Sequence, residues 1–176
     1  MRAVPKTLIA VLAAAGTCLA QAQSGPSDPQ IAQIVVTANQ VDIDAGKLAE
    51  SKGSNAEVKS FGKQMVTDHS GVNKQAVALV TKLKVTPEDN DTSKSLKAGG
   101  ADNVKNLQKL SGAAFDKAYV DHEVVYHQAV LDAVDKTLIP SAQNAELKAL
   151  LVTVRPAFVA HLEHAKMLQA TLAKKS

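Results

Sequence analysis

The amino-acid sequence predicts an all-α protein folded as a four-helix bundle. Four long segments repeat their apolar residues at the spacing of an amphipathic helix. No segment alternates apolar and polar residues as a half-buried β-strand does. Aromatic residues make up only 3% of the 176-residue chain, and all of them fall within the four helical segments. They can therefore fill a core between packed helices.

The first 22 residues are expected to be a cleavable export signal. Arg2 and Lys6 give a positively charged start, and an apolar stretch follows. An A-x-A pattern that ends at Ala22 then places small residues where a signal peptidase cuts. The apolar stretch is shorter than the roughly 20 residues that a membrane-spanning helix needs. The sequence therefore predicts a signal over residues 1–22 and one domain over residues 23–176.

The first two helices are expected over residues 29–51 and 54–83. Asp28 has a side chain of the type that caps helix starts, and it stands directly before the first helix. Ser54 or Asn55 can cap the second helix in the same way. A glycine between the two helices favours a short link.

Residues 84–103 carry the strongest signals for irregular structure. A run of turn-forming residues comes first, and the pair Gly99-Gly100 is expected to break the chain again. Only short helical pieces are predicted here, at residues 92–98 and 102–110.

The third helix is expected over residues 113–137 and the fourth over residues 142–173. Both carry long apolar stripes at helical spacing. Pro140 lies between them and is expected to end the third helix, because proline cannot continue a helix without losing a hydrogen bond.

The lengths of the connections predict the topology. The first and last links are short, so each joins two helices into an antiparallel hairpin. The middle connection is long enough to return the second hairpin across the bundle. One long crossover of this kind is typical of ferritin-like bundles. The predicted fold is therefore a ferritin-like four-helix bundle with a long crossover between helices two and three.

The composition excludes several classes of site. Cys18 is the only cysteine and lies in the predicted signal, so the exported domain would have no disulfide and no thiolate ligand. The chain carries a net charge of +3 without a concentrated basic face, which argues against a nucleic-acid partner. No nucleophile elbow and no glycine-rich phosphate loop is found. We therefore predict no catalytic residue and no organic-cofactor site, and the pattern favours a protein that is not an enzyme.

Four pieces of the sequence follow one another in a recognisable order and spacing. They are Asp42–Ala49, Val58–His69, Leu110–Val120 with His127 beyond it, and Pro156 with His161-Leu162. On these pieces the stretch 32–168 resembles a family of exported bacterial proteins, domain of unknown function 4142. The resemblance implies a ferritin-like fold and brings no activity with it. The family tends to carry glutamate where this chain has Asp42 and Asp44, and aspartate side chains reach less far.

Three histidines are the candidate metal ligands: His69, His127 and His161. Each lies in the middle of a different predicted helix. Imidazole is a good ligand for zinc, copper or iron, and bundle cores are common places to build such sites from facing helices. The acidic residues that could complete the site are Asp44 (or Asp42 beside it), Asp68 and Glu123. The implied cofactor is a divalent transition metal.

Two features oppose a metal site of the ferritin type. Di-iron sites use a glutamate three residues before the histidine, and neither His69 nor His161 has one. Folding the last two helices about Pro140 would also place His161 level with His122 rather than with His127. The default interpretation is therefore that the histidines are core residues, each bonded to a carboxylate or a backbone group.

The sequence supports two functional hypotheses. The default is an exported, non-catalytic helical-bundle protein that acts as a binding or envelope-maintenance module. It would be located in the periplasm, secreted or associated with the outer membrane, with an envelope protein as its partner and no transmembrane segment after signal cleavage. The alternative is a divalent-metal-binding or redox protein of the ferritin-like type. One observation discriminates them: whether three or more candidate ligands converge within ligand distance.

Overall fold

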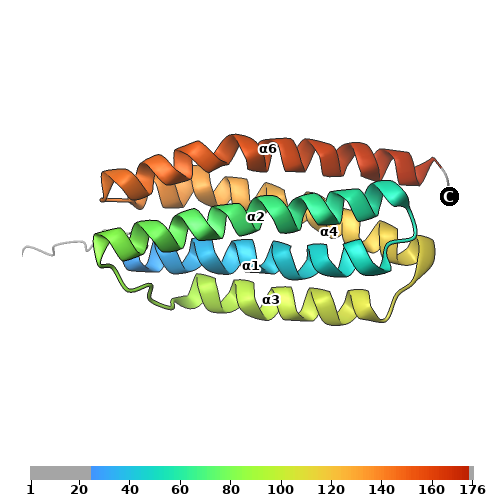
Figure 1. The fold of residues 1–176 in the computed structure, drawn as a ribbon, viewed down its shortest axis with the longest axis horizontal. Helices are drawn as coiled ribbons and strands as arrows, with labels where there is room; N and C mark the ends of the chain where they lie inside the picture. The colour runs from blue at the N-terminus through green and yellow to red at the C-terminus, as the bar shows by residue number, and fades with distance from the viewer. Residues whose placement is uncertain (1–24, 175–176) are drawn as a thin grey trace, which may run out of the picture.

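The protein is all-helical in its computed structural model, which describes residues 25–174. The predicted export signal, with Cys18, lies outside these residues. Five long helices run side by side along the long axis of the molecule (Figure 1), and the described part of the chain contains no β-strand. The helices are α1 (Asp28–Lys52), α2 (Ala56–Leu83), α3 (Asp91–Gln108), α4 (Gly112–Ala133) and α6 (Ala145–Ala173). Among them, none combines the length and hydropathy that a bilayer-crossing segment requires.

Helices α1, α2 and α6 lie close to the segments for which the sequence predicts helices. Asn55 caps α2, because its side-chain oxygen accepts the backbone N–H of Glu57 at 2.8 Å. Asp28 does not cap its own helix. Its carboxylate instead accepts the backbone N–H groups of Gln143 and Asn144, both at 2.9 Å, directly before α6. The start of α1 is therefore fastened to the start of α6.

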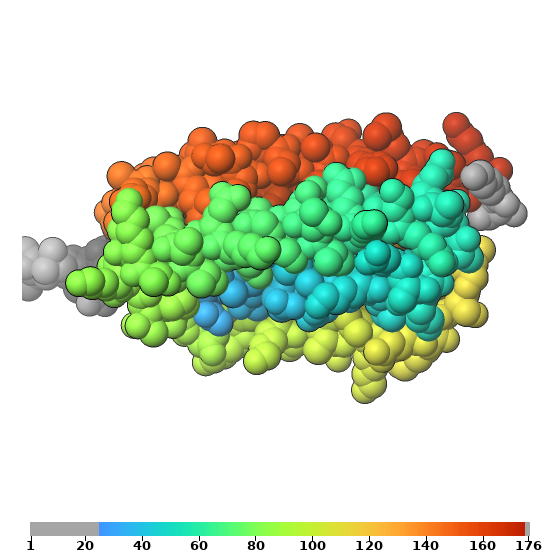
Figure 2. Space-filling view, in the orientation of Figure 1, coloured from blue at the N-terminus to red at the C-terminus, as the bar shows by residue number. Residues whose placement is uncertain are grey.

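The chain does not break at Gly99-Gly100, so that expectation is wrong. Helix α3 runs through both residues without interruption and packs along α1. A Cβ atom at Gly100 would lie 2.6 Å from a methyl group of Val41, whereas a Cβ at Gly99 would meet nothing within 4 Å. Gly100 thus serves the close approach of two helices and not a turn. Figure 2 shows the result: α1 is visible as a narrow strip between α2 and α3.

Pro140 does not end the third helix. Helix α4 continues into a π-helical turn, η1 (Val134–Leu138), and then into a short helix, α5 (Ile139–Ser141), which contains Pro140. The chain reverses only after α5, before α6 begins at Ala145. This later reversal shifts the level at which α6 faces α4.

Helices α1 and α2 approach each other where two glycines meet. A Cβ atom at Gly46 would lie 2.8 Å from the carbonyl oxygen of Gly62, and a Cβ at Gly62 would lie 2.7 Å from that of Gly46. Only residues without side chains allow this distance between the backbones. The contact holds the C-terminal part of α1 against the N-terminal part of α2.

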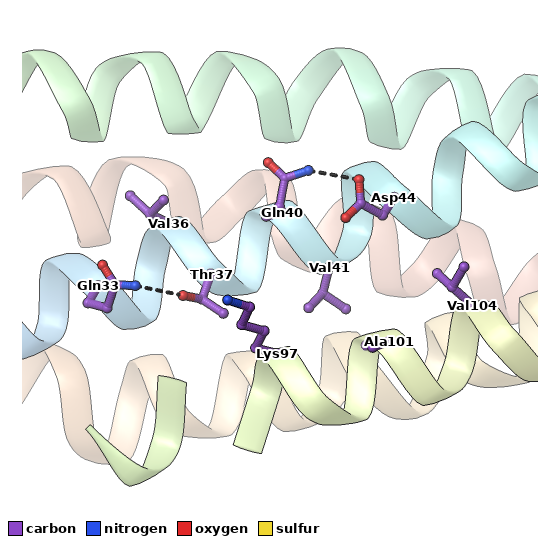
Figure 3. A pocket seen from close by; sticks show the side chains of 10 residues that line it. Gln33, Val36, Thr37, Gln40, Val41, Asp44, Lys97, Ala101 and Val104 are labelled. Carbon is purple, nitrogen blue, oxygen red and sulfur yellow. Dashed lines mark hydrogen bonds between the residues drawn. The ribbon is translucent and has the colours of Figure 1, made fainter. Parts of the chain in front are cut away.

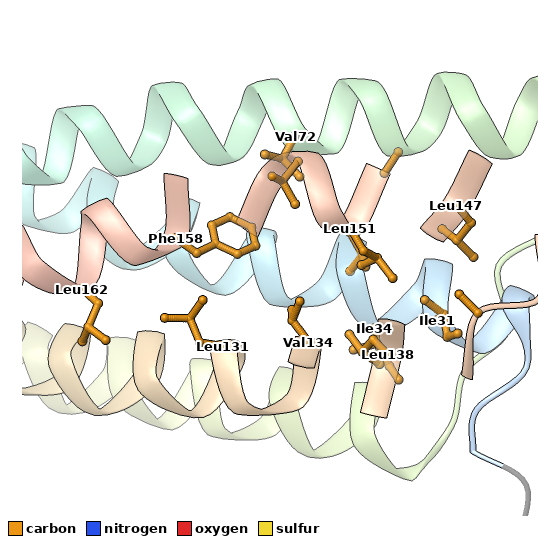
Figure 4. Packing of buried hydrophobic residues seen from close by; sticks show 14 residues of the cluster. Ile31, Ile34, Val72, Leu131, Val134, Leu138, Leu147, Leu151, Phe158 and Leu162 are labelled. Carbon is orange, nitrogen blue, oxygen red and sulfur yellow. The ribbon is translucent and has the colours of Figure 1, made fainter. Parts of the chain in front are cut away.

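The interior contains two apolar clusters, one toward each end of the helices. The first gathers aliphatic side chains around Phe158 and Leu151, as Figure 4 shows. The second surrounds Phe61, Phe115 and Tyr119, which are fully buried. Buried polar residues of α1, α2, α4 and α6 lie between the two clusters, and they form the site described next.

Candidate metal centre

A layer of buried polar side chains crosses the molecule between the two apolar clusters. It contains six residues, none of them more than 3% exposed: Asn39 and Asp42 of α1, His69 of α2, Glu123 and His127 of α4, and His161 of α6. Polar groups are seldom buried to this extent unless they are hydrogen-bonded or bind something. The hydrogen bonds of the layer therefore indicate its role.

The three histidine rings converge at the centre of this polar layer. The ring centroids of His69 and His127 are 5.5 Å apart, those of His69 and His161 are 5.2 Å apart, and those of His127 and His161 are 5.4 Å apart. One nitrogen of each ring lies within 4.8 Å of the other two. Three helices that are distant in sequence thus direct their imidazoles at one point.

Hydrogen bonding fixes the tautomer of His69. Its Nδ1 atom lies 2.7 Å from the side-chain oxygen of Asn39. The amide nitrogen of Asn39 is already used, because it donates to the carbonyl oxygen of Val35 at 2.7 Å. The Asn39 oxygen can only accept, so Nδ1 of His69 carries the hydrogen and Nε2 keeps a free lone pair.

The other two rings are oriented by the same principle. Nδ1 of His127 donates to the backbone oxygen of Glu123 at 3.1 Å, one turn earlier in α4. Nε2 of His161 donates to a carboxylate oxygen of Asp68 at 2.9 Å. Both partners accept hydrogen bonds at these atoms, so Nε2 of His127 and Nδ1 of His161 are the acceptors when these rings are neutral.

The three remaining nitrogens are buried and have no hydrogen-bond partner among the described residues. They are Nε2 of His69, Nε2 of His127 and Nδ1 of His161. Each is the nitrogen that carries no hydrogen when its ring is neutral. A cation placed among the three neutral rings would satisfy all three lone pairs at once.

Two buried carboxylates, those of Asp42 and Glu123, also lie close to His127. Asp42, Glu123 and His127 form a second group whose ligand atoms lie within 4.8 Å of one another. A carboxylate oxygen of Asp42 is 3.5 Å from Nδ1 of His69, and one of Glu123 is 3.3 Å from Nδ1 of His127. The other oxygen of Asp42 and both oxygens of Glu123 make no hydrogen bond within residues 25–174. Burial and the neighbouring Glu123 carboxylate raise the pKa of Asp42 well above its usual range, so positive charge nearby is needed to keep both carboxylates ionised.

The electrostatics of the cluster favour a cation at its centre. Burial, with the nearby positive charge of His127 and His161, lowers the pKa of His69 to about 2. Burial also lowers the pKa of His161. Burial alone would lower the pKa of His127 too, but the negative charges of Asp42 and Glu123 outweigh it and raise that pKa to about 9. Two of the rings are therefore neutral near pH 7, and the third holds positive charge in the cluster.

The sequence-predicted acidic residues do not all lie in the polar layer. Asp44 is exposed, accepts a hydrogen bond from Gln40 at 2.8 Å, and lines a groove between α1 and α3 (Figure 3). Asp68 is 40% exposed and joins the layer only through its hydrogen bond to His161. The aspartate that lies inside the layer is Asp42.

His122 is not the neighbour of His161, so the level predicted for the last two helices is wrong. The ring of His122 stacks on Tyr126 instead, with centroids 5.5 Å apart. The chain reverses beyond Pro140, after the π turn, and this brings His127 level with His161. No periodicity in the sequence announces a π turn, so the pairing could not be read from the apolar stripes.

Sequence reasoning missed Asn39 altogether. Asparagine in a helix usually lies on a solvated face, but Asn39 stands four residues after Val35, on the apolar stripe that runs to Asp42 and Ala45. A polar residue on such a stripe is the signal that could have found it.

Comparison with known proteins gives a family and nothing more specific. A family model described as "Domain of unknown function (DUF4142)" matches residues 13–168, which is most of the chain. No curated protein and no solved structure matches the sequence.

Proposed function

The chain belongs to the DUF4142 family, whose function is unknown, and from this starting point we propose that the protein binds a divalent transition-metal ion in the polar layer. The ligands are Nε2 of His69, Nε2 of His127 and Nδ1 of His161. His127, whose pKa is raised to about 9, gives up its proton when the ion binds. Three neutral imidazoles then suit zinc, copper or another late transition metal, and zinc sites with three protein ligands keep one position open.

One observation carries this proposal: each of the three histidines has a buried ring nitrogen without a hydrogen-bond partner, and ligand atoms of the three rings lie within 4.8 Å of one another. Histidines with a purely structural role would be expected to satisfy both ring nitrogens. Leaving a buried acceptor without a partner costs about 1–3 kcal/mol. A metal ion would offset that cost at all three nitrogens.

The surrounding hydrogen bonds support the same function. A metal-binding histidine usually donates its second N–H to a carboxylate, a carbonyl or another acceptor, which fixes the ring. Asn39, the Glu123 backbone and Asp68 accept these hydrogen bonds from the three rings. Asp42 and Glu123 lie beside the site, and a bound cation would favour their ionised forms against the burial that raises the pKa of Asp42.

The wider setting of the protein is part of the proposal. Helices α1, α2, α4 and α6 would form a ferritin-like bundle, with α3 lying on the crossover. The protein would be exported to the periplasm and would act there as a metal-binding module rather than as an enzyme. The charged and apolar pattern of residues 1–22 supports export.

Metal titration of tag-free protein, first stripped with a chelator, tests the metal site. We expect calorimetry to show one zinc ion per chain and zinc to raise the melting temperature, because the ion binds only the folded state. His69→Ala, His127→Ala and His161→Ala should each abolish the rise. Asp68→Asn should weaken zinc binding about 10- to 100-fold without abolishing it.

His164→Ala is the matched control, since His164 lies on α6 beside Gln64 and outside the layer. Its response to zinc should equal that of the wild type. A melting temperature that does not change with zinc, or a zinc-dependent rise that remains in all three ligand variants, would overturn the proposal. Circular dichroism of each variant separates lost binding from lost folding.

A further inference from the structure

An apolar cavity of about 150 Å³ lies directly beside the histidine cluster. Its walls are side chains of α1, η1, α4 and α6, among them Ile34, Val134, Leu151 and Val154. Its inner end is formed by Asn39, Asp42 and His69, which belong to the polar layer. The cavity therefore connects the apolar interior with the proposed metal centre.

The walls of the cavity offer little to a water molecule. Asn39 uses its amide nitrogen on the Val35 carbonyl and its oxygen on His69. The Tyr126 hydroxyl donates to the Ala38 carbonyl at 3.0 Å. A buried water needs about two to four polar partners, and the buried polar atoms of the lining that remain unpaired belong to Asp42 and His69, at the polar layer. The rest of the lining is mainly apolar and suits an apolar molecule.

The inner end of the cavity touches a proposed ligand. The ring of His69 stacks on Phe158, with centroids 5.3 Å apart and planes 10° apart, and both side chains line the cavity. One carboxylate oxygen of Asp42, also in the lining, makes no hydrogen bond within the described chain. A molecule in the cavity would thus lie against the polar layer and not merely within the apolar core.

The outer end of the cavity opens toward the surface between α3 and α4. Helix α3 packs mainly on α1 and only lightly on α4. A surface groove between α3 and α4 is lined by Thr92, Leu96 and Tyr126, and the same three residues line the cavity. Thr92 is exposed. A small molecule could therefore enter from solvent past α3.

We propose that this cavity binds a small, uncharged, apolar molecule no larger than about a benzene ring, and holds it next to the metal centre. The size limit follows from volume, because a dry cavity of about 150 Å³ lined by aliphatic and aromatic residues accepts benzene or xenon. The inference rests on the proposed function only in one respect, the reason why the protein would hold such a molecule next to a metal ion. Binding itself requires only the cavity.

Xenon and benzene are the probes, and the protein is first stripped of metal. We expect saturable changes in NMR chemical shifts, confined to residues around the cavity. Ala133→Leu places a larger side chain in the lining and should weaken binding at least tenfold. Ala160→Leu makes the same substitution at an exposed position of α6 outside the lining and should bind as the wild type does.

If Ala133→Leu fails to fold, Ala129→Leu makes the same test at the exposed mouth of the cavity. Shift changes that do not saturate, that lie elsewhere, or that persist unchanged in the filled variants would overturn the inference. A zinc titration of the same samples keeps the two proposals apart. Zinc binding without xenon binding removes only the cavity site, and xenon binding without zinc binding removes only the metal site.

Discussion

At the scale of single residues, the hydrogen bond that each histidine makes through one ring nitrogen decides which nitrogen remains for a ligand. His161 faces the cluster with Nδ1 because Asp68 accepts from its Nε2. His69 faces it with Nε2 because Asn39 accepts from its Nδ1. The ring nitrogens available for a ligand are therefore selected by residues that would not touch the metal.

We expect His69 and His127 together to favour the folded, metal-free protein most strongly near pH 6.5. The unfolded chain binds protons at its histidines below about pH 6.5, whereas folded His69 has a pKa of about 2. Stability should therefore fall as the pH drops below 6.5, by up to about 1.4 kcal/mol per pH unit for this residue. Folded His127 has a pKa of about 9, so its contribution is complete below 6.5 and is lost as the pH rises toward 9.

Urea denaturation with a chelator present, from pH 5 to pH 9, measures this curve. His69→Leu should flatten the acidic side, and His127→Leu should flatten the alkaline side. His164→Leu, the same change outside the layer, should leave both sides of the curve of stability against pH as steep as in the wild type. An acidic side that is as steep in His69→Leu as in the wild type would show that His69 is not buried neutral.

The candidate ligands could be predicted from the sequence, but their arrangement could not. His69, His127 and His161 stand in mid-helix, so any bundle brings them near the core. Asp44 and Asp42 are two residues apart, and only packing decides which one is buried. Which nitrogen of each histidine is bonded depends on contacts such as that of His161 with Asp68, which are distant in sequence.

At the scale of helices, glycine has a role that sequence reasoning misread. Gly99-Gly100 has the composition of a turn, yet α3 continues through it because Gly100 lies against Val41 of α1. The bounds of α1, α2 and α6 were easier to predict, since apolar stripes and caps such as Asn55 mark them. The π turn η1 has no such mark.

We expect Gly100→Ala and Gly99→Ala to have opposite effects. A methyl group at Gly100 would meet Val41 and force α3 away from α1, which should cost about 1–3 kcal/mol of stability. The same group at Gly99 meets nothing within 4 Å and should stabilise the helix by about 0.5–1 kcal/mol. Thermal unfolding of the two variants measures the difference. Equal effects would mean that α3 does not pack on α1 through this face.

At the scale of the whole molecule, the polar layer joins two groups of helices. Helix α1 packs chiefly on α2 and α3, and α4 packs chiefly on α6. His69, His127 and His161 connect α2 of the first group with α4 and α6 of the second. A metal ion bound by the three rings would therefore stabilise the assembly of the two groups.

We expect zinc to slow amide hydrogen exchange in α2, α4 and α6 more than in α3. A ligand at 100 times its dissociation constant adds about 2.7 kcal/mol to stability, and helices that carry ligands receive that protection. Helix α3 carries no ligand and can open separately. Mass spectrometry of hydrogen exchange with and without zinc measures this. Equal protection of α3, or protection that remains in His161→Ala, would contradict the expectation.

The position of the polar layer between two apolar clusters also fixes the level at which α6 packs along α4. An apolar stripe looks much the same one turn further along, so α6 could slip along α4 by one turn, about 5.4 Å, with its aliphatic side chains still covered. Such a slip would carry His161 among leucines and valines and bring apolar side chains against Asp42 and Glu123. A single polar layer at one level therefore destabilises bundles in which one helix is shifted by a turn, even before any ion is bound.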